Sequence, residues 1–186
     1  MKKNSKTLML LLLSLFLLAG CGNQVREDPG MSTSGSEQAA GPVRSLEDLL
    51  LSELPAGAVP LDPTLKAAVS PGDSILVTGR IGGVSNPFTE GFALFIMAGE
   101  ELVFCDEMGD DDHCPMPWDA CCEDPVRRSA HRALVQVVDV EGIPLEVSLK
   151  GFGGLVENDS IIVSGVVDAS SNSEKLVINA DGIYRM

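Results

Sequence analysis

Gly72-Asp73-Ser74-Ile75-Leu76-Val77-Thr78-Gly79 recurs in kind as Asn158-Asp159-Ser160-Ile161-Ile162-Val163-Ser164-Gly165. Each copy combines turn residues, an apolar run rich in β-branched residues that is typical of a strand, and a glycine. Glycine weakens a strand unless the strand bends sharply there, as strands must at the corners of a small closed barrel. The two copies therefore predict two bent strands of a barrel.

Further segments have the composition of short strands bounded by Gly, Pro, Asn or Asp. The predicted strands are 74–81, 92–97, 102–105, 132–140, 144–149, 160–167 and 175–184. Between two of them, Val140-Glu141-Gly142-Ile143 predicts a hairpin turn with Gly142 at positive φ. Residues 72–186 are therefore expected to form one all-β domain.

The stretch 73–185 resembles the oligonucleotide/oligosaccharide-binding (OB) fold. In that fold the first and fourth strands often carry a Val-x-Gly-x-Val pattern, matched by Val77-Thr78-Gly79-Arg80-Ile81 and Val163-Ser164-Gly165-Val166-Val167. The resemblance implies a small Greek-key barrel of five strands. The sequence departs from the family where Gly151-Phe152-Gly153-Gly154-Leu155 replaces the usual helix between strands three and four. The alternative is a different small antiparallel barrel or sandwich.

Residues 1–20 have the parts of a signal peptide: three lysines, an apolar run of residues 8–18, then Ala19 and Gly20. The run is shorter than the roughly 20 residues that a membrane-spanning helix needs. Leu18-Ala19-Gly20-Cys21 resembles the lipobox of bacterial lipoproteins. The resemblance implies cleavage before Cys21 and covalent diacylglycerol and N-acyl lipid on that residue, with no other cofactor expected. The alternative is an ordinary signal peptide with a chance cysteine.

The segment after Cys21 predicts a tether rather than a folded unit. Residues 21–45 are rich in Gly, Ser and Pro, so they form a disordered linker. Residues 46–71 are expected to hold a short helix after Ser45 and then an extended, Pro-rich strap. Gly22 stands where some bacteria place the aspartate that retains lipoproteins at the inner membrane. The expected location is therefore the cell envelope, facing the periplasm or cell surface, with the outer membrane favoured.

The charge of the chain excludes one class of partner. The net charge is −14, and removal of residues 1–20 takes away three lysines and no acid, which leaves −17. Such a charge repels phosphate backbones, and aromatic residues are only 4% of the chain, so nucleic acid is not an expected partner.

The remaining cysteines lie in a Cys-rich insertion, residues 105–131, and they are Cys105, Cys114, Cys121 and Cys122. An even number in an exported protein favours disulfides. A bond between the neighbours Cys121 and Cys122 would be strained. Two pairings remain: Cys105–Cys121 with Cys114–Cys122, or Cys105–Cys122 with Cys114–Cys121. Trp118 is expected to form the small core of the insertion.

Two other readings of the insertion stay open. A soft metal, copper(I) rather than zinc, has candidate ligands in His113, Cys114, Met116, Cys121 and Cys122. Their spacing is unlike that of structural zinc sites, so no metal is favoured. Cys121-Cys122 could also be a redox-active pair, with Arg127 and Arg128 lowering a thiol pKa, although acidic residues nearer in sequence would raise it.

No catalytic set is visible around His113 and His131, so the chain is not expected to be an enzyme. Asp110-Asp111-Asp112 predicts a solvated acidic turn, and Arg127, Arg128 and Arg132 are expected to pair with these acids and with Asp106 and Glu107.

The chain also resembles small bacterial lipoproteins that share a Gly-Arg-Ile-Gly-Gly and Pro-Trp-Asp-x-Cys-Cys signature, here residues 79–83 and 117–122. That resemblance implies no function. We expect a membrane-anchored, non-enzymatic binding or assembly module that contacts another envelope protein or a glycan. The alternative is a metal-handling or thiol-redox protein acting through the insertion.

Overall fold

The computed structural model describes residues 46–109 and 114–186. The predicted signal peptide, the Cys21 lipidation site and the tether lie outside the described residues, as do His113 and the Asp110-Asp111-Asp112 run. Within the described ranges, no helix is both long enough and apolar enough to cross a membrane.

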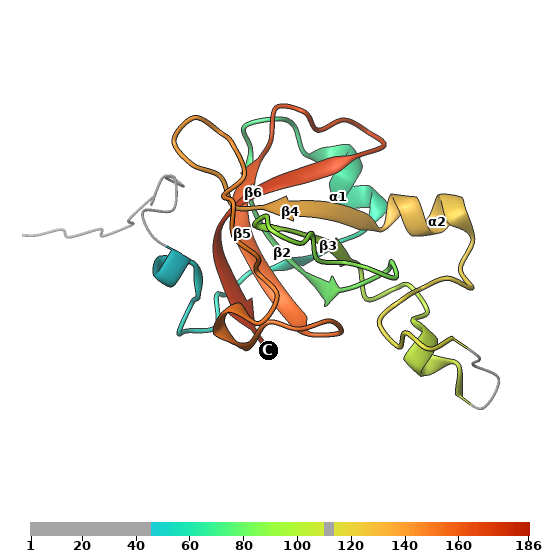
Figure 1. The fold of residues 1–186 in the computed structure, drawn as a ribbon. Coiled ribbons are helices and arrows are strands. Elements are labelled where there is room, and N and C mark those ends of the chain that lie inside the picture. Colours follow the sequence, from blue (N-terminus) through green and yellow to red (C-terminus); the bar gives the residue numbers. More distant parts are fainter. Residues whose placement is uncertain (1–45, 110–113) are drawn as a thin grey trace, which may run out of the picture. The chain divides into compact units, whose positions relative to one another are not determined.

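The described residues form short helices and a six-stranded sheet. The strands are β1 (Val59–Pro60), β2 (Ser74–Ile81), β3 (Leu94–Ala98), β4 (Arg132–Gln136), β5 (Ser160–Val167) and β6 (Leu176–Arg185). The helices are η1 (Leu46–Leu49), α1 (Pro63–Ala68), η2 (Cys105–Glu107), α2 (Pro125–Ala130) and η4 (Phe152–Gly154). Figure 1 shows their arrangement.

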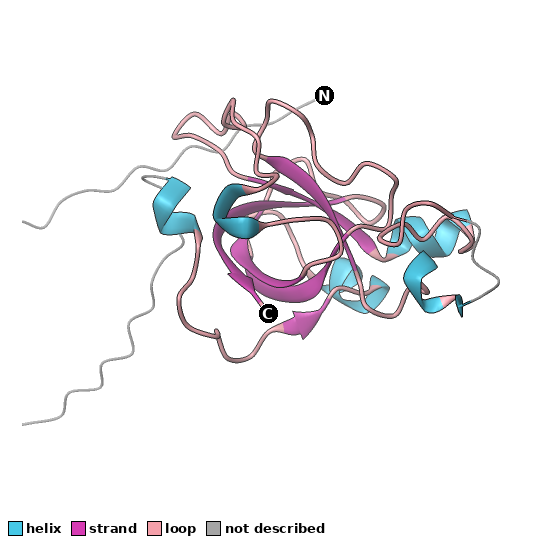
Figure 2. Ribbon diagram, turned by 60° about the horizontal axis from the view of Figure 1, so that its bottom comes forward, coloured by secondary structure: helices cyan, strands magenta, loops and turns pink. Residues whose placement is uncertain are grey.

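Five strands close into a barrel. Strand β2 pairs with β3, β3 with β4, and β5 with both β6 and β2, all antiparallel. Strands β4 and β6 are parallel neighbours, which completes the ring seen in Figure 2. This order confirms the expected small all-β, OB-like barrel. The connection from β4 to β5 holds only the short turn η4, so the usual OB helix is absent there.

The glycines of the two repeated segments lie where strands approach closely. A Cβ on Gly79 would lie 2.5 Å from the carbonyl oxygen of Ala98 on β3. A Cβ on Gly165 would overlap the backbone of Asn179, beside the register shift between Ser164 and Gly165. At both positions only glycine leaves room for the neighbouring strand, which is the close backbone approach that glycine in a strand permits.

The core fills the barrel. Alternate residues of the strands point inward and are fully buried, as Val77, Phe95 and Ile178 illustrate. Leu49 of η1 and Leu61 pack against the same cluster, so the segment before β2 covers part of the barrel. Burial of this apolar surface is the main stabilising contribution to the fold.

Two predicted strands were wrong. Residues 102–105 contain buried apolar side chains but turn into η2, where Glu107 N–H donates to the Phe104 carbonyl at 3.0 Å. Residues 144–149 keep only an isolated bridge between Val138 and Pro144. The turn itself is confirmed with Gly142 at φ +81°, but only that isolated bridge, rather than two paired strands, flanks it.

The predicted strap was also partly wrong, because residues 63–68 form helix α1. Asp62 accepts a hydrogen bond from Leu65 N–H at 2.7 Å, and Pro63 occupies the first turn. An acidic N-cap followed by proline favours the start of a helix, because proline in the first turn loses no helical hydrogen bond. The prediction treated Pro63 as a helix breaker instead.

Candidate functional site

Three thiols come together in the connection between β3 and β4, residues 99–131. The sulfur of Cys121 lies 3.5 Å from that of Cys105 and 3.5 Å from that of Cys114. All three sulfurs lie within 4.8 Å of one another, and we call this group the thiol cluster. Cys122 Sγ lies 3.9 Å from Cys121 Sγ. A disulfide needs about 2.05 Å, so the predicted disulfides are not formed among these four described cysteines.

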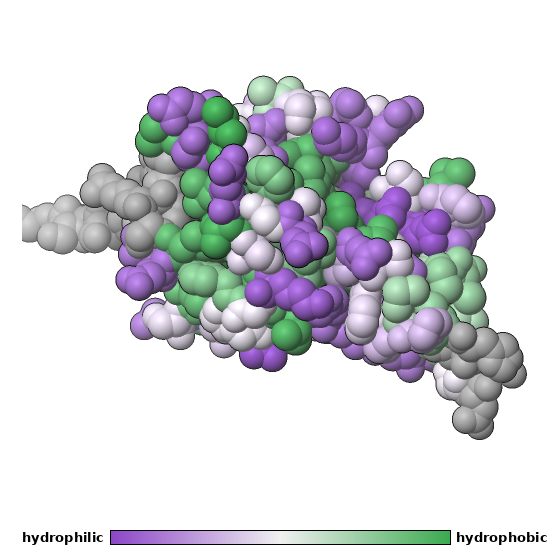
Figure 3. All heavy atoms as spheres, viewed as in Figure 1, coloured by the Kyte–Doolittle hydropathy of each residue, from purple (hydrophilic) through white to green (hydrophobic). Residues whose placement is uncertain are grey.

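The thiol cluster has a closed side and an open side. Cys105 is 1% exposed, Cys114 is half-buried, and Cys121 and Cys122 are exposed. In Figure 1 this region extends away from the barrel, and the same place in Figure 3 shows weakly hydrophobic surface. A small ion or reagent could therefore approach from the side of Cys121.

Backbone pairing within the connection brings the thiols together. Cys105 N–H donates to the Asp119 carbonyl at 2.8 Å, and Asp106 N–H donates to the Pro117 carbonyl at 3.2 Å. These bonds join two arms of the loop that are more than ten residues apart in sequence. The buried residues Ala98, Leu102, Phe104 and Ala120 form the local core, whereas Trp118 is half-buried.

Arg80 on β2 holds the first arm against the barrel. Its guanidinium donates to Glu107 Oε1 at 2.6 Å and to Asp106 Oδ2 at 2.7 Å. The same group stacks 4.0 Å from the centre of the Phe104 ring and also donates to Asn158. The expected pairing of Asp106 and Glu107 with Arg127, Arg128 and Arg132 was therefore wrong, because an arginine of the barrel takes both acids.

Gly82 and Gly83 hold the second arm. Gly83 N–H donates to the Trp118 carbonyl at 2.8 Å, and a Cβ on Gly82 would overlap that same carbonyl. Trp118 Nε1 donates to the Ser85 carbonyl at 3.0 Å. Residues 79–83 and 117–122 are thus in direct contact.

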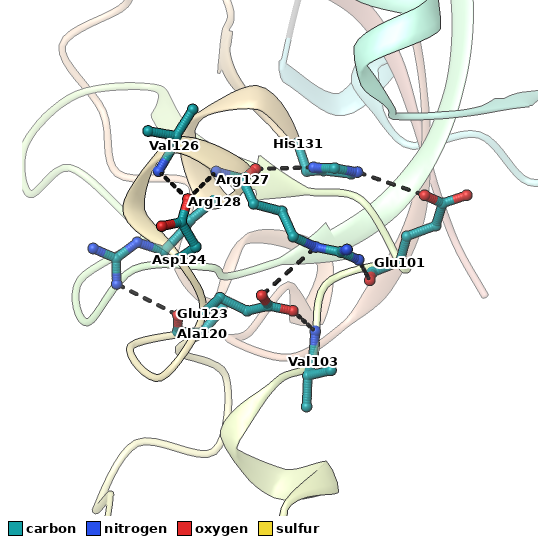
Figure 4. Close-up of polar contacts among 9 residues, drawn as sticks. All are labelled: Glu101, Val103, Ala120, Glu123, Asp124, Val126, Arg127, Arg128 and His131. Atoms are coloured by element: carbon teal, nitrogen blue, oxygen red, sulfur yellow. Dashed lines mark hydrogen bonds and ion pairs between the residues drawn. The ribbon is translucent and has the colours of Figure 1, made fainter.

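Helix α2 is fixed to the start of the connection by the polar contacts of Figure 4. Glu123 accepts from Val103 N–H at 2.9 Å and lies 3.6 Å from Arg127 Nε. Arg127 donates to the Glu101 carbonyl at 2.6 Å. Asp124 accepts from the N–H groups of Val126 and Arg127 at the start of α2. These contacts set the position of Cys121 and Cys122, which directly precede Glu123.

His131, the only histidine in the described ranges, is held by structural contacts. It is buried, with Nδ1 2.9 Å from the Arg127 carbonyl and Nε2 3.5 Å from Glu101. Met116 contributes its carbonyl to Cys114 Sγ at 3.7 Å. Of the predicted metal ligands, Cys114 and Cys121 are therefore brought together, and Cys105, absent from that set, joins them.

The most buried thiol of the cluster, that of Cys105, has a shifted pKa. Burial raises the pKa of the Cys105 thiol to about 12, with a further contribution from its hydrogen bonds to the Cys121 and Cys114 thiols. Cys105 is therefore protonated near neutral pH unless a partner removes its proton. Two arginines were expected to activate a thiol: Arg127 is bound to Glu123 and to the Glu101 carbonyl, and Arg128 donates to the Ala120 carbonyl at 3.4 Å.

A buried lysine that sequence reasoning missed connects three elements. Lys66 of α1 is 6% exposed, and its ammonium donates to the carbonyls of Ser129, Arg132 and Glu174 at 3.0, 3.2 and 3.0 Å. Burial, and then the charge of Arg132, lower the pKa of Lys66. The partners are backbone carbonyls, which leave no pattern in the sequence.

A shallow cavity of about 320 Å³ lies on the outer face of the barrel next to these contacts. Its lining residues include Ile96 on β3, Leu134 on β4 and Leu176 on β6, together with Arg132 and Lys175. The cavity is open to solvent and carries no group with a catalytic partner among its lining residues.

Comparison with known proteins gives no relative: no family model, curated protein or solved structure matches this chain. The OB-like assignment therefore comes from the strand order alone, and fold alone does not define a function. Function must be argued from the residues of the β3–β4 connection and of the N-terminus.

Proposed function

We propose that this chain is a lipid-anchored, non-enzymatic binding module of the cell envelope, in which the barrel presents the β3–β4 connection to another protein. The observation that carries the proposal is the attachment of this long loop to the barrel through Gly83, Trp118 and Arg80. A loop held in one conformation loses less entropy on binding than a mobile one.

The surface of the connection suits a protein partner. Val103 is 46% exposed and Val126 is 77% exposed, and both belong to the group of residues in Figure 4. Exposed aliphatic side chains beside a polar rim are typical of protein interfaces. Glycan binding usually uses exposed aromatic rings, and aromatic residues are scarce in this chain.

The proposal of a non-enzymatic role rests on the histidine and the buried thiol of the β3–β4 connection. In the described ranges the one histidine has both ring nitrogens next to structural partners, and the buried thiol of Cys105 has a raised pKa. Turnover by the purified protein that a single substitution in the connection abolishes would contradict this part of the proposal.

Site-specific photo-crosslinking in intact cells tests the binding surface. A photoreactive residue at Val126 should give one discrete protein adduct. The matched control is Val140, which is 80% exposed. It lies after β4 and therefore outside the β3–β4 connection. An adduct from Val140 and none from Val126 would refute the assigned surface, and an adduct that a glycosidase removes would identify a glycan instead.

The anchor is tested separately. Intact mass spectrometry of the mature wild-type protein should show acyl chains on Cys21, and Cys21→Ser should release the protein from the membrane fraction. The lipids would each contribute about 0.8 kcal/mol per buried CH₂. A wild-type protein without acyl chains would contradict the anchor and leave the crosslinking result intact.

A further inference from the structure

We propose that Cys105, Cys114 and Cys121 form a three-thiolate site for a soft metal ion, monovalent copper. The inference is independent of the proposed partner protein, because it concerns the thiol cluster alone. It assigns metal binding to cysteines for which two disulfides were expected from the sequence.

The sulfur positions fit one ion. A metal–sulfur bond of about 2.3 Å places the sulfurs around a single ion about 3.8–4.0 Å apart. The cluster has two sulfur separations of 3.5 Å, and its third pair lies within 4.8 Å. Small side-chain rotations would therefore place all three sulfurs at bonding distance from a common centre.

The grouping of the sulfurs is less suited to two disulfides. Two disulfides require four sulfurs in two separate pairs, whereas here Cys105 and Cys114 both approach the same sulfur, that of Cys121. Cys122 is adjacent to Cys121 in the chain and lies outside the group of three sulfurs within 4.8 Å. Cys122 is therefore not assigned as a ligand.

A set of three thiolates selects among metals. Soft thiolates favour monovalent copper and zinc over harder ions. Zinc in structural sites takes four ligands in a tetrahedron, and the group of described ligand atoms offers three. Copper(I) accepts three-coordinate thiolate sites, so it is the better match to this set.

The surroundings suit such a site. Cys105 closes it from the interior, between the buried residues Phe104 and Ala120. The Arg128 guanidinium donates to the Ala120 carbonyl at 3.4 Å, next to Cys121, and its buried Nε has no hydrogen-bond partner among the described residues. This positive charge would offset part of the negative charge of three thiolates. Each thiol releases its proton on coordination, so up to three protons leave for each ion bound.

Anaerobic titration of the full chain with copper(I) tests the site. The Cys21→Ser background leaves only the four thiols of the connection, and a chelator of known affinity competes for the ion. We expect one copper per chain. Each of C105A, C114A and C121A should weaken binding by more than about 100-fold, the upper cost of losing an outer-shell contact.

The matched control is C122A, which should bind copper as the parent chain does. X-ray absorption of the copper-loaded parent counts the sulfur ligands directly, and three are expected even if C105A fails to fold. An equal loss of copper binding in C122A would overturn the proposal. So would two disulfides in the native protein together with no copper uptake after full reduction. Preferred binding of zinc by four sulfurs would also overturn it.

Discussion

Gly83 N–H donates a 2.8 Å hydrogen bond to the Trp118 carbonyl, which joins the end of β2 to the Cys-rich insertion 35 residues further along the chain. Gly82 faces the same carbonyl so closely that no side chain fits between them. The Gly-Gly pair therefore lies directly against the Pro-Trp-Asp segment. It also makes Trp118 a reporter of whether the insertion is attached.

Gly82→Ala should detach the insertion from the barrel. The new methyl group would overlap the Trp118 carbonyl, and a backbone atom can move away only by shifting its whole segment. The expected loss is about 1–3 kcal/mol of unfolding free energy, as for an overpacked core. Trp118 is the only tryptophan, so a red-shifted fluorescence spectrum measures the detachment.

Gly142→Ala is the control for this substitution. Gly142 has φ +81° and nothing within 4 Å of the position of a Cβ, so alanine there brings backbone strain of about 1 kcal/mol and no collision. Its tryptophan spectrum should match that of the wild type. If Gly82→Ala also leaves the spectrum unchanged, the contact does not hold the insertion.

Arg80→Met should loosen the first arm of the connection. The side chain of Arg80 is 12% exposed and binds Asp106, Glu107 and the face of Phe104 at once. Loss of hydrogen bonds to charged groups costs about 1.5–3 kcal/mol. Limited proteolysis should cut the variant within residues 99–131 faster than the wild type.

Arg185→Met provides the comparison, because Arg185 is 48% exposed and pairs with Asp159 at 2.9 Å. Exposed ion pairs contribute about 0–1 kcal/mol. Equal destabilisation by the two substitutions would show that Arg80 acts only as a surface charge.

The local patterns were enough to predict the barrel strands but not the site. Strands β2 and β5 match the predicted ranges 74–81 and 160–167, because a turn, alternating burial and a bend-forming glycine are all encoded within a few residues. The thiol cluster depends instead on the hydrogen bond between Cys105 N–H and the Asp119 carbonyl. This bond joins backbone groups that are distant in sequence, and any residue type could form it. Because this bond leaves no pattern in the sequence, Cys105 is predicted there only as a disulfide partner and not as a metal ligand.

Lys66→Met should destabilise the fold more than its place in a short helix suggests. It removes a buried ammonium and leaves the carbonyls of Ser129, Arg132 and Glu174 without that donor. The expected loss is about 2–4 kcal/mol, since each unsatisfied buried group costs about 1–3 kcal/mol. Urea unfolding measures it. Lys175→Met, at an exposed position, should stay within about 0.5 kcal/mol of the wild type.

Asp168 should make stability depend on acid pH. Hydrogen bonds from the Ser170 side chain, and also from its N–H and from Asn179, lower the pKa of Asp168 from its ordinary 3.8 against the opposing effect of burial. A carboxylate with a lowered pKa in the folded state stabilises that state above the unfolded pKa, and the stabilisation is lost as the pH falls through the folded pKa.

Asp168→Asn should therefore lower the unfolding free energy near neutral pH by about 1.5 kcal/mol, the lower end of the range for hydrogen bonds to charged groups, because Asp168 is only half-buried. The difference from the wild type should shrink below pH 3.8 and become small once wild-type Asp168 is protonated. Urea unfolding across this range measures it. Glu141→Gln, on an exposed turn, removes the same unit of charge and controls for net charge. A constant difference at every pH would contradict the role of the ionised carboxylate.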